Sequence, residues 1–280
     1  MVVGTVISVI ILIANYGINI HQLLNFTGTN GQMKLWILQV FSTTLPLLLS
    51  PIIFAKFIVK ESSTYLKTRT DISLLLMLLA LTGMIVSLPL IGELSLLNQK
   101  MQLPQFLKGL EEWMRRKEND AEAMMKIMLN MKSIGALLFN LLLVGLITGI
   151  AEEFLFRGCV QTILMRWFKK PWVAIWVTAI VFSFFHMEFY GFLPRMVLGV
   201  LFGYFAWWSG SIWPAVLGHF FNNGFAVLLT YMYQHHQIKM NPDDNMTVNP
   251  IVYIISLILT VILLLIYKRI ALTEKQEQQY

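Results

Sequence analysis

The 280-residue sequence is poor in charged residues and contains a single cysteine. Asp, Glu, Lys and Arg make up 13% of the chain, against roughly a quarter in soluble domains, which excludes an ordinary soluble protein. Cys159 by itself can form neither an intrachain disulfide nor a zinc site built from several cysteines. Hydrophobic residues instead make up 57% of the chain, with a mean hydropathy of +0.67. Because the apolar runs are long and continuous, the sequence predicts an all-α polytopic membrane protein.

Eight apolar stretches are candidate membrane spans, since about 20 apolar residues cross a hydrocarbon core of about 30 Å. Several are short or run into a neighbour, so seven spans is the alternative count. Two contain glycines four residues apart, Gly145-xxx-Gly149 and Gly199-xxx-Gly203, which predicts close helix packing. The eight stretches are Val2–Ile18, Leu35–Ala55, Ile72–Ile91, Ile134–Phe156, Val173–Phe189, Met196–Trp208, Ile212–Tyr231 and Ile251–Tyr267.

The spans suggest a division of the chain into four parts. We expect a three-helix membrane segment over 1–91, an interfacial connector over 92–133, a membrane core with the candidate site over 134–270, and a polar tail over 271–280. The connector mixes seven basic with six acidic residues and carries large apolar residues at roughly helical spacing. This pattern predicts one or two amphipathic helices at the membrane interface, with a small helical hairpin packed on the spans as the alternative.

The basic residues predict the orientation in the membrane. We interpret the net charge of +6 as a sign of topology and not of nucleic-acid binding. With eight spans, three basic clusters fall on one side, so both termini are expected in the cytoplasm. The segments His21–Gln32 and His235–Asn249 on the other side carry only Lys239, although the connector's basic residues do not favour that side. The clusters are Lys56, Lys60, Lys67 and Arg69; Arg166, Lys169 and Lys170; and Lys268, Arg269 and Lys275.

Several polar side chains lie deep in apolar sequence, where a charge costs from about 3 to more than 10 kcal/mol and usually serves a function. Glu153 and Arg157 are four residues apart, so they can pair on one helix face. We predict that Asn140 and Asn222 form hydrogen bonds between helices. The full set is Asn140, Glu152, Glu153, Arg157, His186, His219, Asn222 and Asn223.

The depth of two of these residues can be compared by counting from the predicted turn at Lys169. Glu152 lies seventeen residues before Lys169 and His186 seventeen after it. In an antiparallel hairpin both then lie about 25 Å from the turn, and we expect them to face each other. His219 and Asn223 share a helix face, but the same kind of count places them nearer the cytoplasmic end of their span.

A carboxylate facing one histidine, with a second histidine and an amide nearby, can activate water. A buried glutamate can act as a general base near neutral pH, and neutral imidazoles can orient the water or ligate a divalent metal. An Asn and a His can donate to the oxyanion that forms when water attacks an amide. The implied reaction is hydrolysis of a peptide bond at the membrane. A transporter or proton relay would also place Glu and His at mid-depth, although the chain shows no inverted repeat. An ion-paired helix contact is the structural alternative for the two glutamates.

Three short patterns occur in order along the chain and together resemble a known family. They resemble the motifs of the CAAX-protease and bacteriocin-processing (CPBP) intramembrane proteases, which include prenyl endopeptidases of the Ras-converting-enzyme type. The resemblance implies eight core helices, an active site inside the membrane that opens toward the cytosol, and a membrane-anchored protein or peptide as substrate. The three patterns are Glu152-Glu153-xxx-Arg157, Phe182-xxx-His186 and His219-xxx-Asn223.

The resemblance also implies residue roles. Glu152 is the base that activates water, His186 is its partner, and His219 with Asn223 binds the oxyanion or a metal; the other members of the first pattern play supporting roles. A divalent metal such as zinc, held by Glu152, His186 and His219, and a glutamate-activated water without metal are both consistent with the family. The family's substrates are prenylated C-termini, bacteriocin leaders and regulatory membrane proteins. We expect an intramembrane peptidase of the bacterial plasma membrane, with a non-proteolytic immunity or scaffold member as the alternative.

Overall fold

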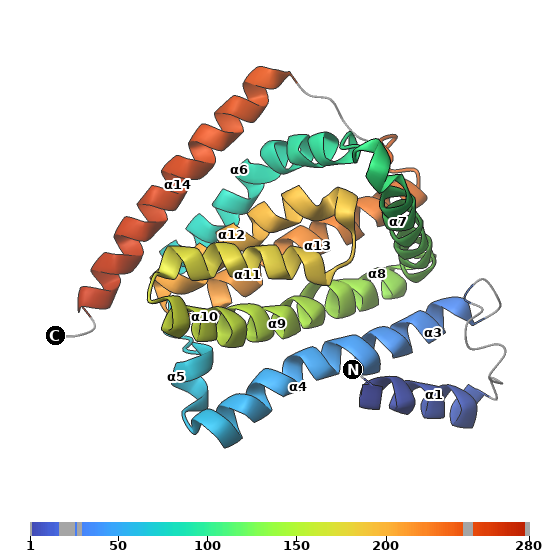
Figure 1. The fold of residues 1–280 in the computed structure, drawn as a ribbon, viewed down its shortest axis with the longest axis horizontal. Helices are drawn as coiled ribbons and strands as arrows, with labels where there is room; N and C mark the ends of the chain where they lie inside the picture. Colours follow the sequence, from blue (N-terminus) through green and yellow to red (C-terminus); the bar gives the residue numbers. More distant parts are fainter. Residues whose placement is uncertain (1, 17–25, 27–29, 243–248, 278–280) are drawn as a thin grey trace.

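The computed structural model describes residues 2–16, 26, 30–242 and 249–277. Within these ranges the regular structure is helical throughout, which confirms the all-α class (Figure 1). The end of the expected first span, and parts of the two segments expected on the outer side, lie outside the described residues.

The helices follow the expected stretches, with different ends. Two long helices, here called rods, run without a break but alternate between α-helical and π-helical hydrogen bonding along their length. The first contains α3 (Gly31–Leu38), η1 (Gln39–Thr44), α4 (Leu45–Phe54) and η2 (Ala55–Val59). The second contains α8 (Ile134–Asn140), η4 (Leu141–Ile147), α9 (Thr148–Glu153), η5 (Phe154–Val160) and α10 (Gln161–Phe168). The other elements are α1 (Val2–Tyr16), α5 (Ser62–Leu66), α6 (Leu74–Gln99), η3 (Gln105–Leu107), α7 (Lys108–Met128), α11 (Pro171–Phe185), η6 (Phe189–Gly191), α12 (Phe192–Ser209), α13 (Trp213–Gln234) and α14 (Pro250–Glu277).

Five helices of the described chain are long and apolar enough to cross a membrane. Val2–Ala14 and Pro171–Phe185 are apolar but shorter, and α13 carries several of the polar residues noted above. The chain is thus an integral membrane protein with five supported spans, and the count of eight stays a prediction. The five are Gly31–Val59, Leu74–Gln99, Ile134–Phe168, Phe189–Ser209 and Pro250–Glu277.

The rod that carries the two glutamates contains π-helical turns on both sides of α9. Such turns free carbonyl groups, which must find other donors in a membrane. In η4 the carbonyl of Leu143 accepts a hydrogen bond from the Thr148 hydroxyl at 2.9 Å, and that of Val144 accepts from Asn223 Nδ2 at 3.3 Å. The widened turn is therefore stabilised by side chains, one of which comes from α13.

The glycine pattern of α12 forms a close helix contact, as predicted. A Cβ atom on Gly199 would lie 3.0 Å from the Cβ of Ala179, and one on Gly203 would lie 2.8 Å from Ile175 Cγ2. The same two glycines expose their carbonyls to the rod 134–168: Gly199 accepts from Arg157 Nη2 and Gly203 from Gln161 Nε2, each at 3.1 Å. Glycine therefore allows α12 to approach α11 and the glutamate-bearing rod at once.

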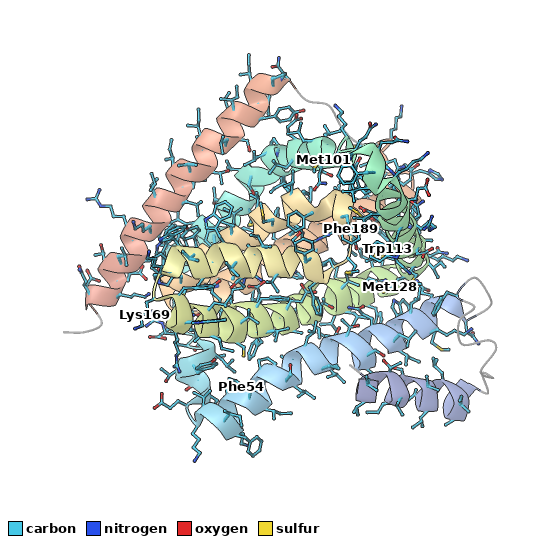
Figure 2. The ribbon with its side chains drawn as sticks, viewed as in Figure 1. Phe54, Met101, Trp113, Met128, Lys169 and Phe189 are labelled. Atoms are coloured by element: carbon cyan, nitrogen blue, oxygen red, sulfur yellow. The ribbon has the colours of Figure 1, made fainter. Side chains whose placement is uncertain are left out.

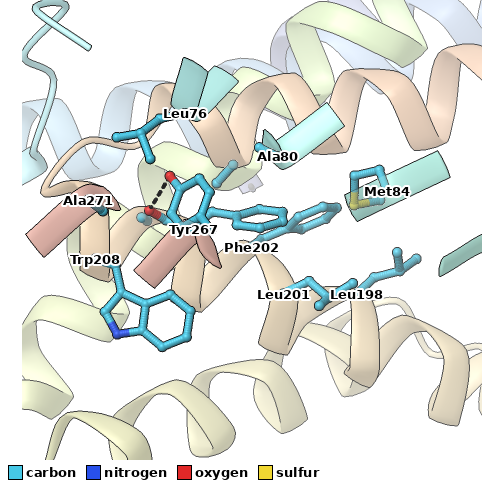
Figure 3. Packing of buried hydrophobic residues seen from close by; sticks show 12 residues of the cluster. Leu76, Ala80, Met84, Leu198, Leu201, Phe202, Trp208, Tyr267 and Ala271 are labelled. Carbon is cyan, nitrogen blue, oxygen red and sulfur yellow. Dashed lines mark hydrogen bonds between the residues drawn. The ribbon is translucent and has the colours of Figure 1, made fainter. Parts of the chain in front are cut away.

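The main apolar core joins α6, α12 and α14 (Figure 3). In it the Tyr267 hydroxyl donates to the carbonyl of Phe205 at 3.1 Å, so the buried hydroxyl is satisfied. Ala271 belongs to this core, and Lys275 Nζ donates to the carbonyl of Trp207 at 3.0 Å. The expected polar tail thus begins as helix, because α14 continues to Glu277 and its last turns pack on the protein.

The connector forms one long amphipathic helix, α7, within the described residues. It lies across one end of the bundle, where Trp113 and Phe189 pack with ring centroids 5.5 Å apart (Figure 2). Gln32 Nε2 donates to the carbonyl of Met128 at 3.0 Å and ties α7 to α3. The connector thus contains one long amphipathic helix and no hairpin of two, and its position at the membrane interface stays a prediction. The expected boundary after residue 91 falls inside α6.

Candidate active site

Glu152 and Glu153 end α9 and are both buried. Neighbouring positions on a helix point about 100° apart, so the two carboxylates face different partners. Glu153 Oε1 lies 2.9 Å from Arg157 Nη1, and both side chains are fully buried. The predicted pairing is therefore present. The rings of Phe182 and Phe202 lie 4.6 and 5.3 Å from the guanidinium, which places Arg157 between aromatic faces.

His219 lies between the two glutamates. Its Nδ1 atom is 2.8 Å from Glu153 Oε1, and its Nε2 atom is 3.5 Å from Glu152 Oε2. The imidazole also stacks on Phe202, with centroids 5.1 Å apart and planes inclined by 16°. Since a carboxylate accepts, Nδ1 carries a proton, and the Nε2 atom faces Glu152.

The expected depth of His219 is wrong. The count assumed that the turn before α13 lies at the membrane surface, but Ser209, Ser211 and Ile212 are buried inside the protein. The amide of Ile212 donates to the carbonyl of Lys67 at 3.0 Å. The turn is therefore covered by the segment around Lys67, and the packing brings His219 within 3.5 Å of Glu152.

His186 closes α11 and faces Glu152, as the hairpin count predicted. Its Nδ1 atom lies 2.9 Å from the carbonyl of Phe182, and its Nε2 atom lies 3.7 Å from Glu152 Oε2. A carbonyl only accepts, so Nδ1 is protonated here too and Nε2 is directed at the glutamate. The backbone carbonyl of Phe182 thus sets the tautomer of His186, and the Phe182 ring packs edge-on against the imidazole with centroids 4.9 Å apart. Glu152 Oε2 itself is buried without a hydrogen-bond partner.

A cavity of about 320 Å³ adjoins this centre. Asn222 Nδ2 donates to Asn223 Oδ1 at 3.2 Å, and both amides line the cavity without bonding either glutamate. Asn140 bonds Trp36 on another helix at 3.3 Å, as predicted, whereas the interhelical role expected of Asn222 is wrong. The cavity is lined by Ile91, Gly92, Ser95, Phe182, His186, Gly191, Pro194, Arg195, Leu198, Phe202, His219, Asn222 and Asn223.

Sequence reasoning missed two polar residues around the site. Arg195 lines the cavity and binds the Glu188 carboxylate with Nη2 and the Glu188 carbonyl with Nη1. Gln161 is fully buried and bonds α12 through Gly203. Both stand near the ends of apolar stretches, where a polar residue is unremarkable, so the signal that could have revealed them is weak. Gln161 follows Arg157 by four residues, and this spacing is the one available clue.

The described residues do not fit a bound metal. No group of three or more His, Cys, Asp or Glu side chains among them is arranged to hold an ion. The Nε2 atoms of His186 and His219 lie 3.7 and 3.5 Å from Glu152 Oε2, and the metallopeptidase alternative gains no support. We therefore derive no step through a metal.

The fold and the buried carboxylate–imidazole centre define an integral membrane protein with a candidate hydrolytic site. Residues 134–225 match the family model of type II CAAX prenyl endopeptidases, Rce1-like, a family of proteases. All three sequence patterns lie inside the matched region, so the resemblance drawn from them is confirmed. No curated protein and no solved structure matches the chain.

Proposed function

We propose that the chain is an intramembrane endopeptidase that hydrolyses a peptide bond in a membrane-associated protein or peptide. The observation that carries the proposal is the convergence of two imidazole Nε2 atoms on Glu152 Oε2, at 3.5 and 3.7 Å, inside the matched region. These gaps are longer than a direct hydrogen bond, and the proposed catalytic water lies beside these atoms, within hydrogen-bonding reach of Glu152.

In the proposed reaction Glu152 is the general base. Water held between Glu152 and the Nε2 atom of His186 gives one proton to the carboxylate, and its oxygen forms a bond to the peptide carbonyl carbon. The C–N bond then breaks, and the proton on Glu152 passes to the leaving amine. The second proton of the water passes from the new carboxylic acid to the amine, so the products are a carboxylate and an ammonium, and Glu152 is again a carboxylate.

Glu153 has a larger part in this scheme than a partner for Arg157. Its carboxylate accepts a hydrogen bond from the Nδ1–H of His219, which sets the tautomer of that ring and stabilises its protonated form. A protonated His219 would present Nε2–H to the oxyanion, as the sequence pattern suggests for its role. Asn223 is the second proposed donor: its Nδ2 atom bonds Val144 with one hydrogen and has another available.

The proposal predicts that Glu152→Gln and His186→Ala each abolish cleavage while the protein is still made and inserted. Removing a general base costs about 10²- to 10⁴-fold in rate, and losing the imidazole removes one of the groups that hold the water. The measurement is mass spectrometry of new protein termini in membranes that contain either the wild type or a variant.

The connector offers a matched control. Glu111-Glu112-xxx-Arg116 repeats the first pattern literally, but Glu112 is exposed and Glu111 pairs with Arg115. Glu112→Gln should therefore leave processing unchanged. Normal processing by Glu152→Gln or His186→Ala would sink the assignment, and solute-dependent proton flux in proteoliposomes without any proteolysis would favour a transporter.

A further inference from the structure

Basic side chains from two distant parts of the chain meet at the end of α12. Lys67 and Arg69 come from the segment between α5 and α6, and Lys275 comes from the last turn of α14 (Figure 1). Two of them bond the end of α12: Arg69 Nη2 donates to the carbonyl of Ser209 at 3.1 Å, and Lys275 Nζ donates to the carbonyl of Trp207 at 3.0 Å. The tertiary structure therefore gathers three cations that lie far apart in the sequence.

Gly210 separates two of these cations without a side chain. It follows α12 with a φ of +72°, a conformation that favours glycine. A Cβ atom on it would lie 3.1 Å from Lys275 Cε, 3.4 Å from Lys275 Nζ and 4.0 Å from Arg69 Nε. The ammonium and the guanidinium therefore flank the same backbone position, and the side chain of Lys275 packs directly on it.

The positive charge of this group exceeds the negative charge around it. Lys67 Nζ donates to the neutral hydroxyl of Thr162 at 3.0 Å, and Lys275 donates to a backbone carbonyl. No acidic oxygen of the described residues lies within 4.0 Å of either ammonium group, whereas Arg69 pairs with Asp71 at 3.8 Å. The end of α12 supplies about half a negative charge, so the two lysines alone leave a surplus of roughly one positive charge or more.

Holding these like charges together costs free energy. Burial, with the charges of Lys275 and Arg166 nearby, lowers the pKa of Lys67 to about 8. Arg166 belongs to the same region, because its Cζ atom lies 4.9 Å from the ring centroid of Tyr65 beside this segment. An anion among these groups would attract all of them and remove the repulsion.

The aromatic residues near the group indicate its depth in the membrane. Trp167 and Trp172 flank the turn between α10 and α11 and are 74% and 58% exposed. Tryptophan is enriched where the hydrocarbon core meets the headgroups, and the anions at that level are lipid phosphates. Leu272 is exposed and lies three residues before Lys275 on the same face of α14, so apolar surface for an acyl chain adjoins the charges.

We propose that Lys67, Arg69 and Lys275 bind the phosphate group of an anionic lipid. Basic pockets between membrane helices recognise such headgroups through charge, and Arg69 adds the planar donor geometry that suits a phosphate. The bound lipid ties the last turn of α14 to the end of α12 and to the segment after α5. None of these three residues lines the cavity beside Glu152, so the site stands apart from the proposed function.

The ligand is tested on the whole protein, purified in detergent, by native mass spectrometry. Dioleoylphosphatidylglycerol should be retained at concentrations at which dioleoylphosphatidylcholine, with the same chains and no net charge, is not. An excess of inorganic phosphate should not displace the retained lipid. Displacement by inorganic phosphate would show a site for a free anion and overturn the assignment to a lipid. Equal retention of the two lipids would overturn the anion site itself.

Two double variants locate the site. Lys67→Gln with Lys275→Gln should bind the phosphatidylglycerol about 30-fold more weakly, since each basic residue contributes about fivefold at a membrane surface. Lys108→Gln with Arg116→Gln removes the same charge from exposed positions of α7 and should bind as the wild type does. Equal losses in both would mean unspecific charge attraction and overturn the proposal. If the first variant does not fold, Lys275→Gln should still lose about fivefold and Lys275→Arg should retain binding; unchanged binding by Lys275→Gln contradicts the site.

Discussion

At the scale of single residues, burial and not spacing decides how much an ion pair contributes to the stability of this protein. Glu153 and Arg157 are four residues apart on a helix, and so are Glu122 and Lys126. The first pair is fully buried, and Arg157 is also bonded to Gly199. The second pair is exposed, with side chains 51% and 60% accessible. An exposed pair of this kind contributes about 0.3–0.5 kcal/mol, whereas breaking a buried pair costs about 3–5 kcal/mol.

We expect Arg157→Ala to lower the free energy of unfolding by about 3–5 kcal/mol, because it leaves the Glu153 carboxylate buried without its cation. Thermal unfolding in detergent, followed by tryptophan fluorescence, measures the change. Lys126→Ala is the matched control and should shift the melting temperature by little. Similar shifts for the two variants would show that the buried pair is not special.

A second prediction at this scale concerns metal. Because the described residues form no metal-binding group, we expect the proposed peptidase activity of the purified protein to persist in a strong chelator. The assay compares cleavage of a membrane-proximal substrate in detergent with and without the chelator. A loss of activity that zinc restores would contradict the water-activation scheme.

At the scale of elements, glycines set the distance between helices that carry the site. Gly203 approaches Ile175 on α11 and Gln161 on the glutamate-bearing rod, where an added Cβ would lie 2.8 and 2.9 Å from their nearest atoms. The π-helical turns of that rod have a different effect. They widen the helix, so the backbone carbonyl of Val144 is free to accept a hydrogen bond from Asn223 on α13. The site is thus assembled by one contact that needs a small residue and another that needs a freed carbonyl.

Gly203→Ala should therefore destabilise the protein by about 1–3 kcal/mol, since the new methyl group must push the helices apart. Gly109→Ala on α7 is the control: an added Cβ there meets nothing within 4 Å, and alanine favours a helix by up to about 1 kcal/mol. The two variants should shift the melting temperature in opposite directions. If Gly203→Ala leaves the melting temperature unchanged, α11 and α12 can move apart without a loss of stability.

At the scale of the whole molecule, like charges are crowded at the end opposite α7. Burial, with Lys275 and Arg166 nearby, lowers the pKa of Lys67 from its ordinary value of 10.5 to about 8. In the unfolded chain the ordinary value returns, so between pH 8 and 10.5 the unfolded state binds more protons than the folded one. Stability due to this group therefore rises with pH in that window.

We expect Lys67→Met to remove this dependence. Below about pH 8 the charged amine is disfavoured in the folded protein. As the pH rises toward 10, the free energy of unfolding of the wild type should therefore increase relative to that of the variant. Melting temperatures of both proteins in detergent across this range measure the difference. Parallel curves would show that Lys67 remains protonated throughout and that the crowding has no effect on folding.

The sequence by itself determined the helical membrane class, the pairing of Glu153 with Arg157, and the register of Glu152 with His186. These follow from apolar run length, from the helical repeat and from counting across one turn, all of which are local. Only the tertiary structure decided that His219 lies between the two glutamates and that Arg195 lines the cavity beside them. The reason is physical: the turn before α13 is buried by residues distant in the chain, and which helix ends surround a cavity depends on packing among elements that local patterns do not relate.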